Sequence, residues 1–581
     1  MTDRRIGVYI CYCGGNISDY VEVEKVRDAI NNDSGVVIAK TTMFACSDAA
    51  QEEMIEDIKT NKLDGLVVAS CSPKLHLFTF RAMAERAGLN PYQYVQVNLR
   101  EQDSWAHQHD KDHATEKGIR LVRAGIAKCA LTEPLSTMRI KTTPKALIIG
   151  AGVAGLRAAI SLSDMGLSVF VIEKEAEVGG WTAKFGNMFP NDRKGSDLIN
   201  SLHNDAKKRE NITIFSNAEL IEKSGSVGDF SVVVKVGGKE TISLNVGAII
   251  VSTGFDSYQP SDSEFGYGQD GVITLPEFKQ ILDSSNGSLA YQGRTIKDIA
   301  YIYCVGSRQE ESEDLPHPNK YCSRYCCTAA VHTSLEVGIK DKAIHQFHLY
   351  RDIRTYGKFE LLYNSALNNG SIFMKYADND FPKVGRAGEK VRITIKDLLT
   401  HGEEFDIDVD LLVLVTGMIP RENKKLVDVL KLPIGMDGFF NEIHPKLRPV
   451  ETVIDGVFIA GASQGPKTLA ESVASSMAAV SKSAALLMKG YVDLEPLIAK
   501  IDPERCVWCD ECIKACPYGA IEKVSFENKE VARIIPSLCK GGGACVPACP
   551  VNAIDVEGYT DVQITAMIDS LIKEVAYEKS N

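Results

Sequence analysis

Residues 145–174, KALIIGAGVAGLRAAISLSDMGLSVFVIEK, decide the fold of this 581-residue chain. A short apolar run up to Ile149 predicts a buried strand, and Gly150, Gly152 and Gly155 then form a G-x-G-x-x-G turn that opens a helix. The first glycine permits a tight turn, the second lets backbone N–H groups approach a pyrophosphate, and the third packs the helix on the strand. The pattern predicts a dinucleotide site at the positive N-terminus of this helix.

An acidic residue completes the pattern. Glu173 ends the second predicted strand, 18 residues after Gly155, where its carboxylate can bond the ribose hydroxyls of an adenosine and would repel a 2′-phosphate. The predicted contacts of this half of the dinucleotide are Gly150, Gly152, Val153, Ala154, Gly155, Glu173 and Lys174.

Later segments favour FAD over NAD as the dinucleotide. Residues 247–254 and 411–417 are apolar strands that end in Thr-Gly, and residues 456–462 lead into an Ala/Ser-rich helix. These segments resemble the closing strands and final helix of two-dinucleotide flavoproteins, in which that helix points its N-terminus at the flavin. The predicted flavin contacts are Gly180, Trp181, Thr253, Gly254, Gly461, Lys467 and Thr468.

Lys467 is the candidate catalytic residue. It stands at the start of the final helix, and its charge near N5 or the N1–C2=O edge would stabilise anionic reduced flavin. The alternative is an exposed lysine at a helix start, an arrangement that the helix dipole disfavours.

Composition excludes several classes of protein. The net charge of −12 and the lack of a basic tract argue against nucleic acid as a partner. No apolar run approaches the roughly 18 residues of a membrane helix, and no signal-peptide cleavage pattern follows the first residues. We therefore expect a reducing cytoplasm, in which the sixteen cysteines are better explained as metal ligands than as disulfides. Cys129 stands apart from the other fifteen.

Four cysteines follow the strands predicted at residues 6–13, 36–40 and 65–69. Because strand ends of an α/β sheet face one crevice, these side chains could converge on one iron–sulfur cluster. The alternative is that some of them are buried core cysteines. The four are Cys11, Cys13, Cys46 and Cys71.

A second cysteine group stands where a pyridine-nucleotide reductase would carry its second G-x-G-x-x-G. Residues 302–308, IYCVGSR, and 321–327, YCSRYCC, lack that fingerprint. The four cysteines in C-x17-C-x3-C-C are sufficient to hold a [4Fe–4S] cluster. A redox disulfide between the adjacent cysteines is the alternative, but it would leave the other two without a role. The four are Cys304, Cys322, Cys326 and Cys327.

The carboxyl-terminal region is an internal repeat. The pattern C-x2-C-x2-C-x3-C-P at residues 506–517 recurs 33 residues later, which predicts a two-cluster ferredoxin. By the usual exchange of the fourth ligand, one cluster takes Cys506, Cys509, Cys512 and Cys549, and the other takes Cys516, Cys539 and Cys545. Gly542 occupies the position that matches Cys509, so the second cluster lacks one expected thiolate.

These regions predict an α/β protein in three parts. Residues 1–140 form an α/β domain with an expected [4Fe–4S] cluster, and residues 141–495 form a two-dinucleotide-binding, thioredoxin-reductase-like FAD domain with an embedded [4Fe–4S] cluster. Residues 496–581 form the two-cluster ferredoxin and a C-terminal helix. About four clusters are expected, of which the one near Gly542 is a [3Fe–4S] form or has a non-cysteine ligand.

In this order, CYCGGN, FACSDAAQE, SCSPKLH, NLREQDSWAH, GAGVAGL, CVGSR, YCSRYCC and GPKT, followed by a ferredoxin, closely resemble the flavin-bearing A-type component of heterodisulfide reductase and its bacterial relatives. The resemblance covers essentially the whole chain. It implies an FAD protein that splits electron pairs toward high- and low-potential acceptors, with Cys304, Cys322, Cys326 and Cys327 holding the cluster beside the flavin.

The resemblance also implies partners. These are B- and C-type redox subunits, a hydrogenase-, formate- or NADH-linked module, soluble ferredoxin, and a second copy of the chain in a homodimer. One departure is that residues 181–247 contain no cysteine, so the extra ferredoxin domain inserted near here in larger family members is missing. Two alternatives remain open: a flavin relay that feeds a quinone-linked, disulfide or acyl-CoA reductase without bifurcation, and a scaffold whose clusters are mainly structural.

Overall fold

The computed structural model describes residues 4–285, 287–312 and 315–578, with backbone alone for 573–578. Contacts divide the chain into two compact units. One unit is Met1–Arg139 together with Asp493–Asn581, and the other is Ile140–Val492. The three domain boundaries proposed from the sequence stay a prediction.

The amino-terminal part is a parallel four-stranded sheet with helices on both faces. Alternate side chains of the central strand serve the two faces. Ile6, Val8 and Ile10 pack with α1 and α4, whereas Tyr9 and Cys11 pack with α2 and α3. The strand order is β2 (Val36–Thr42), β1 (Ile6–Cys11), β3 (Gly65–Ser70) and β4 (Tyr94–Asn98), and the helices are α1 (Val23–Ile30), α2 (Asp48–Thr60), α3 (Pro73–Arg86) and α4 (Lys111–Ala130).

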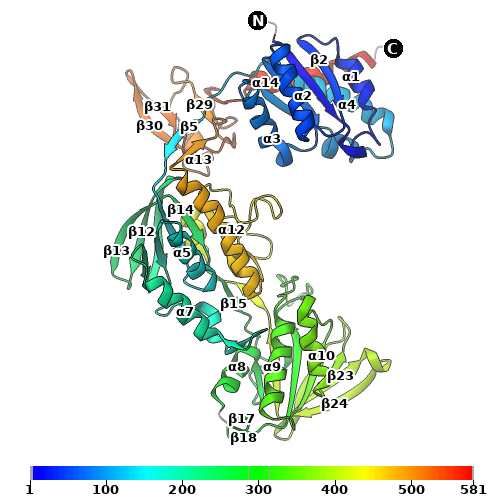
Figure 1. The fold of residues 1–581 in the computed structure, drawn as a ribbon, viewed down its shortest axis with the longest axis vertical. Helices are drawn as coiled ribbons and strands as arrows, with labels where there is room; N and C mark the ends of the chain where they lie inside the picture. Colours follow the sequence, from blue (N-terminus) through cyan, green and yellow to red (C-terminus); the bar gives the residue numbers. More distant parts are fainter. Residues whose placement is uncertain (1–3, 286, 313–314, 579–581) are drawn as a thin grey trace. The chain divides into compact units, whose positions relative to one another are not determined.

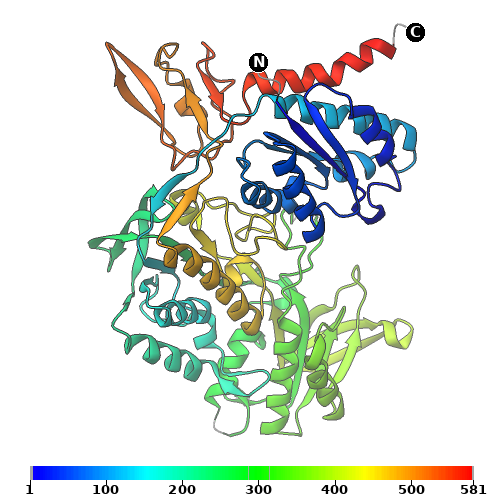
Figure 2. The same ribbon diagram turned by 45° about the horizontal axis from the view of Figure 1, so that its top comes forward.

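The carboxyl-terminal part of the same unit has the small strands of a ferredoxin. The last helix, α14 (Asp561–Glu578), lies along α4, and the two are side by side in Figures 1 and 2. The side-chain amide of Gln563 donates to the Leu131 carbonyl at 2.9 Å, which ties the two helices together. The ferredoxin elements are β29 (Ala499–Ile501), α13 (Glu511–Ala515), β30 (Ile521–Phe526), β31 (Lys529–Ile534) and β32 (Ile554–Val556).

The unit Ile140–Val492 is built from two similar halves. Each half has a five-stranded parallel sheet and a separate three-stranded antiparallel sheet. The first half has the order β10 (Ile212–Phe215), β7 (Ser168–Ile172), β6 (Lys145–Ile149), β14 (Ala248–Val251) and β27 (Val457–Ile459), with β11 (Ala218–Ser226), β12 (Asp229–Val236) and β13 (Glu240–Val246). The second half has the order β16 (Val272–Thr274), β25 (Leu411–Thr416), β19 (Asp298–Val305), β20 (His345–Tyr350) and β21 (Ile372–Lys375), with β22 (Lys383–Ala387), β23 (Lys390–Asp397) and β24 (Glu403–Val409).

Helices cover these sheets through small and apolar side chains. Ala158, Ala159 and Leu162 of α5 and Ala479 and Val480 of α12 belong to one core with the first sheet. Figure 1 shows α5 and α12 close together over this half. The helices of the unit are α5 (Val153–Asp164), α6 (Gly180–Lys184), α7 (Gly195–Lys207), α8 (Leu275–Ser284), α9 (Cys326–Lys340), α10 (Glu360–Asn368), α11 (Lys424–Leu430) and α12 (Leu469–Met488).

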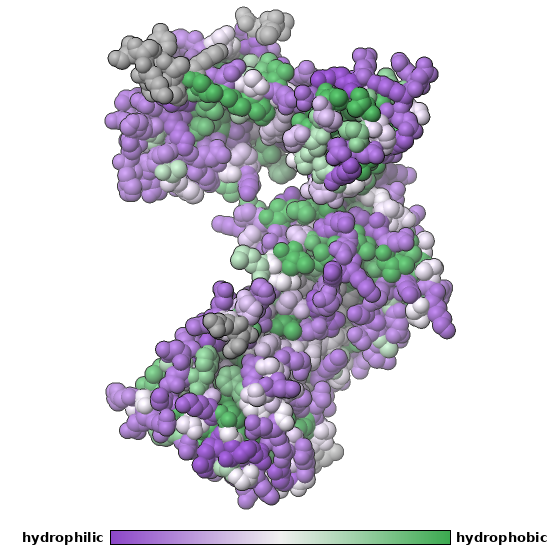
Figure 3. Space-filling model, turned by 180° about the vertical axis from the view of Figure 1, so that it is seen from behind, coloured by the Kyte–Doolittle hydropathy of each residue, from purple (hydrophilic) through white to green (hydrophobic). Residues whose placement is uncertain are grey.

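The expected α/β class is confirmed, and the predicted first strands and glycine turn lie where the sequence pattern places them. The helix predicted over residues 21–31 spans Val23–Ile30. Within the described residues, no helix is both long enough and apolar enough to cross a membrane. Figure 3 shows hydrophobic residues in scattered patches on a mainly hydrophilic face.

Candidate functional site

A cavity of about 1680 Å³ lies within the unit Ile140–Val492. Both halves line it, the first with its glycine turn and the second with Tyr325, Ala329, His332 and Thr333 around α9. Every residue predicted to contact the dinucleotide lines this cavity except Gly155: Gly150, Gly152, Val153, Ala154, Glu173, Lys174, Gly180, Trp181, Thr253, Gly254, Gly461, Lys467 and Thr468.

The three glycines of the turn do different work. At Gly155 a Cβ would lie 1.9 Å from the Gly150 carbonyl oxygen, so only glycine lets α5 approach β6 this closely. Gly150 has a φ of +103°, and a Cβ there would lie 2.5 Å from the Ser252 carbonyl oxygen. Gly152 has open space at its Cβ position and faces the cavity. The turn therefore leaves room for a phosphate group at the N-terminus of α5.

Glu173 is buried at the edge of the cavity. Its carboxylate accepts the N–H of Ala151 at 2.8 Å and the N–H of Glu175 at 3.1 Å. Both bonds fix the carboxylate against the glycine turn, which orients it for a ribose as well as holding the turn in place. Lys174, by contrast, is an exposed side chain 3.7 Å from Glu219.

Two further groups shape the flavin side. The indole N–H of Trp181 donates to the Phe255 carbonyl at 2.9 Å, and the two rings stack with centroids 5.9 Å apart. The hydroxyl of Thr253 is buried in the cavity wall and has no hydrogen-bond partner among the described residues. A buried hydroxyl ordinarily has a partner, so this position fits a polar group of a bound cofactor.

Lys467 faces the cavity at the turn before α12. Burial lowers the pKa of its ammonium group, and the negative charges of Glu442 and Glu471 oppose that effect. The neighbouring Thr468 caps the helix together with Glu471. Lys467 is therefore a half-buried cation that faces the site, as the sequence interpretation requires for an action on the flavin.

The cysteines of the second half gather at the end of β19 and the start of α9. The buried Cys304 thiol has a raised pKa because of burial and the adjacent Cys327 thiol, and Arg351 and Arg308 oppose the shift. Cys326 donates to Cys327, which lowers the pKa of Cys327 and raises that of Cys326. Cys322 also lies close enough to raise the pKa of Cys326. All four predicted ligands are thus neighbours.

This cysteine group adjoins the cavity. Cys326 and Cys327 are the first residues of α9, and Tyr325, Ala329 and Thr333 on either side of them line the cavity wall. Residues of one helix therefore belong to both sites.

The amino-terminal cysteines also converge. Burial raises the pKa of Cys11, and backbone N–H groups of Cys13 and Ala45 reach its sulfur at 3.2 and 3.4 Å. Burial raises the pKa of Cys71 to about 11, with further contributions from Cys13 and Cys46. The four side chains face one another at the carboxyl ends of β1 and β3 and in the loop after β2, as the parallel sheet predicts.

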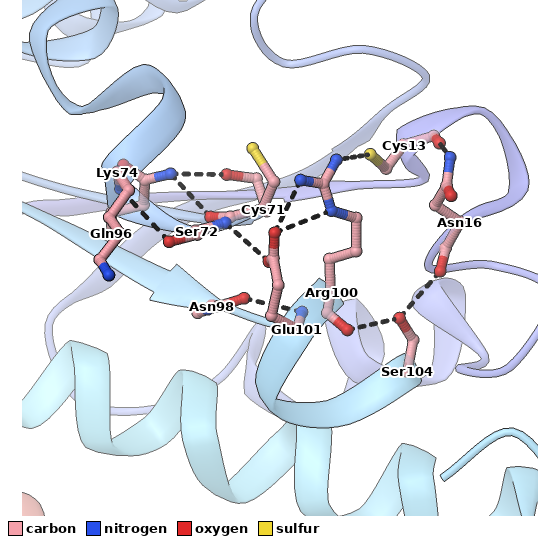
Figure 4. A network of polar contacts seen from close by, with 11 residues as sticks. Cys13, Asn16, Cys71, Ser72, Lys74, Gln96, Asn98, Arg100, Glu101 and Ser104 are labelled. Atoms are coloured by element: carbon pink, nitrogen blue, oxygen red, sulfur yellow. Dashed lines mark hydrogen bonds and ion pairs between the residues drawn. The ribbon is translucent and has the colours of Figure 1, made fainter. Parts of the chain in front are cut away.

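A guanidinium group lies within this cysteine group, as Figure 4 shows. Arg100, in the π-helical turn Arg100–Ser104 after β4, places Nη1 3.6 Å from the Cys13 sulfur. Its position is fixed by Glu101, which binds Arg100 at 2.7 Å and accepts the Ser72 N–H at 2.9 Å. The positive charge of Arg100 lowers the pKa of Cys71 against the effect of burial. This arrangement stabilises thiolates.

The ferredoxin cysteines form two groups. Cys506, Cys509, Cys512 and Cys549 line one small cavity. Backbone N–H groups of Ala532 and Ala553 reach the sulfurs of Cys506 and Cys549 at 3.4 and 3.3 Å.

In the other ferredoxin group, burial raises the pKa of Cys545, and the nearby thiols of Cys539 and Cys516 add to the shift. The backbone N–H groups of Ala499 and Ala520 reach Cys539 and Cys516 at 3.4 and 3.5 Å. At Gly542 a Cβ would have only the Tyr518 ring within 4 Å, at 3.9 Å.

Among the described residues, no three His, Cys, Asp or Glu side chains are arranged to hold a single metal ion. A [4Fe–4S] cluster instead takes one thiolate per iron, so its ligands surround a larger group. The convergence of thiols around backbone N–H donors fits such clusters.

Family models agree with these two chemistries. Residues 145–187 match the model described as FAD binding domain, and residues 499–556 match the model described as 4Fe-4S dicluster domain. FAD and [4Fe–4S] clusters are therefore the cofactors of this chain.

Relatives extend along the whole chain. HdrA 2 of Methanopyrus kandleri, an iron-sulfur component of its CoB--CoM heterodisulfide reductase, is 34% identical over 91% of this chain and 92% of its own length. The chain belongs to the HdrA family of heterodisulfide reductase components. It is accordingly an oxidoreductase component. Another member, the corresponding component of the H(2):CoB-CoM heterodisulfide,ferredoxin reductase of Methanothermobacter thermautotrophicus, is 34% identical over 90% of this chain and 91% of its own length.

Solved structures are more distant. Thioredoxin reductase from T. acidophilum covers 59% of this chain and 99% of its own, with 19% identity and a TM-score of 0.40. The Lactococcus lactis enzyme covers 60% of this chain and 100% of its own, with 14% identity and a TM-score of 0.42. The two-half fold of this family member rests on the strand orders given above.

Sequence reasoning missed several residues around the cavity. Lys279 and His332 line it from the second half, and Asp192 lies 2.7 Å from the His332 ring. Arg421 also lines it and donates to the Phe255 carbonyl at 3.2 Å. No local pattern marks any of these residues, because each reaches the site only through the tertiary fold.

Proposed function

We propose that this chain is the FAD/iron–sulfur electron-transfer component of a heterodisulfide-reductase-like complex, and that it divides electron pairs between two routes. The observation that carries the proposal is the shared helix α9, whose first residues are two clustered cysteines and whose next turn lines the cavity. A cluster held there adjoins the flavin without an intervening domain.

The chain's own residues position the chemistry. The glycine turn and the N-terminus of α5 bind the pyrophosphate, Glu173 orients the adenosine ribose, and Lys467 places a cation beside the flavin. FAD accepts electrons in pairs, whereas iron–sulfur clusters carry them singly, and cluster potentials span roughly −700 to +450 mV. The half-buried charge of Lys467 stabilises negative charge on the flavin, because a cation in a partly desolvated site acts more strongly than one in water.

The proposed cluster ligands fall into four sets. Three sets have four thiolates each, and the set near Gly542 has three. The sets are Cys11, Cys13, Cys46 and Cys71; Cys304, Cys322, Cys326 and Cys327; Cys506, Cys509, Cys512 and Cys549; and Cys516, Cys539 and Cys545. The last set forms a three-iron cluster or a four-iron cluster whose odd iron has a non-thiolate ligand.

Two partner surfaces follow from the two routes. One electron leaves through the Cys304–Cys327 set toward the amino-terminal set, and the ferredoxin provides the other connection. Exposed apolar side chains lie in the segments that carry or follow the amino-terminal ligands. Five such side chains in these segments favour a docked redox protein there: Met43, Phe44, Leu75, Phe78 and Trp105.

The names of the relatives indicate which partners to test. One is named for H(2) and ferredoxin, and a Methanococcus maripaludis relative is named for H(2)/formate. We propose B- and C-type subunits with a hydrogenase-, formate- or NADH-linked module in a reducing cytoplasm, soluble ferredoxin as an acceptor, and a homodimer of this chain.

A redox titration of the purified protein separates this function from its rivals. Bifurcation predicts crossed flavin potentials, in which the second electron leaves at a lower potential than the first. Ordinary potentials would identify a relay, and redox-silent clusters would identify a scaffold. Proteins that co-purify with the chain identify the donor and acceptor.

A further inference from the structure

Glu471 uses its two carboxylate oxygens for different purposes. Oε2 accepts the N–H of Thr468 at 2.8 Å and the Thr468 hydroxyl at 3.1 Å, which completes the capping box of α12. Thr468 and the adjacent Lys467 line the cavity. One oxygen therefore holds the turn that faces the flavin site.

The other oxygen reaches the iron–sulfur segment. Oε1 accepts a hydrogen bond from the guanidinium of Arg324 and one from the Tyr356 hydroxyl at 3.3 Å. The same guanidinium lies 5.9 Å from the centroid of the Tyr356 ring. A capping box does not require these contacts, because capping needs only the first oxygen.

Arg324 belongs to the loop that carries the cysteines. It stands between Cys322 and Cys326, and its backbone N–H lies 3.3 Å from the Cys322 sulfur. Its φ of +62° places a non-glycine residue in the left-handed region, so the loop has a specific conformation to maintain. The carboxylate of Glu471 thus joins the turn of one cofactor site to the ligand loop of the other.

Charge adds to this connection. Burial raises the pKa of Glu471, but the Thr468 N–H and the positive charge of Arg324 lower it overall, so the carboxylate is ionised. Glu471 and Arg324 also act on Lys467 with opposite sign. Since both side chains of the ion pair are substantially exposed, the pair adds little to stability. Its contacts are better explained by position than by folding energy.

We propose that Glu471 is a positioning residue that fixes the Cys322–Cys327 loop against the Lys467–Thr468 turn and so controls the passage of single electrons from reduced flavin to the neighbouring cluster. The inference rests on the proposed function, because it requires both cofactors. In each transfer the flavin loses one electron and the cluster gains it.

The test compares E471Q and E471D with the wild-type protein, each loaded with FAD and iron. E471Q should keep both cofactors, raise the flavin midpoint potential because a negative charge beside Lys467 is lost, and slow flavin-to-cluster transfer after photoreduction by roughly 10- to 100-fold, as a small misplacement of reacting groups does. E471D should restore the potential but not the rate, since it keeps the charge on a shorter side chain.

Two further variants separate position from folding. Y356F keeps the capping box and should slow transfer to a smaller extent, and it carries the test if E471Q loses its cofactors. D408N breaks the exposed Arg392–Asp408 pair in the same unit and should behave as the wild type. E471Q, or Y356F in its place, with wild-type rate and potential would overturn the proposal, whereas a wild-type protein that binds no FAD or holds no iron at these cysteines would refute the proposed function itself.

Discussion

The two halves of Ile140–Val492 share an architecture and differ at one position. In the first half, β6 ends in a glycine turn and α5 begins at once, with a phosphate-sized opening at Gly152. In the second half, β19 ends at Cys304 and Val305, and a long loop with Cys322 precedes α9. The same strand-to-helix junction serves a dinucleotide in one half and thiolates in the other. A scaffold of this kind fixes where a ligand lies, while the junction residues decide which ligand it is.

The largest expected effect comes from the first junction. Gly155→Ala should abolish FAD binding, because its Cβ would lie 1.9 Å from the Gly150 carbonyl oxygen, and it should destabilise the unit by about 1–3 kcal/mol or more. Flavin absorbance after desalting and denaturant unfolding measure the two effects.

Gly338→Ala in α9 is the matched control, since nothing lies within 4 Å of its Cβ position. It should keep FAD and stabilise the protein by roughly 0.4–1 kcal/mol. A Gly155→Ala protein with normal FAD content would show that the two junctions do not differ as described.

The second junction predicts a missing activity. NADH or NADPH should not bleach the flavin of the isolated protein at the rates of about 1–10³ s⁻¹ typical of enzymes, because cysteines replace the second nucleotide fingerprint. Stopped-flow absorbance measures this. Rapid bleaching by either nucleotide without a partner protein would mean that the second half still binds a nicotinamide.

A smaller effect is expected in the ferredoxin, where the two cysteine groups offer a comparison of the same kind. Gly542→Cys should raise the iron content or change the cluster spectrum, because a Cβ there meets only the Tyr518 ring at 3.9 Å. Gly542→Ala adds the same Cβ without a thiol and should change neither property. If the cysteine variant also changes neither, another ligand already completes that cluster.

Much of this could be predicted where the signal is local. The glycine turn, the cysteine spacings and the strand ends place FAD and four cysteine groups, because each depends on neighbours in sequence. The contacts between groups could not be predicted. Arg324 and Glu471 are 147 residues apart, and Arg100 reaches Cys13 across 87 residues. Neither pair has a periodic pattern, and both depend on how separate elements pack.

The domain organisation gives the same lesson. The sequence divides the chain into three successive regions, whereas α14 packs on α4 and joins the two ends of the chain in one compact unit. The apolar face of α14 indicates that the helix must pack against something, but not which helix it meets.

The central claim is that a cluster at the second junction carries electrons away from the flavin. Cys326→Ser tests it most directly, with Cys129→Ala as the control, because Cys129 is a fully buried cysteine outside all four groups. Electron delivery to the redox protein docked at the amino-terminal side is measured together with the FAD and iron content. We predict that Cys326→Ser keeps FAD, loses iron and stops this delivery, whereas Cys129→Ala keeps all three properties. Undiminished delivery by Cys326→Ser with that cluster absent would contradict the account.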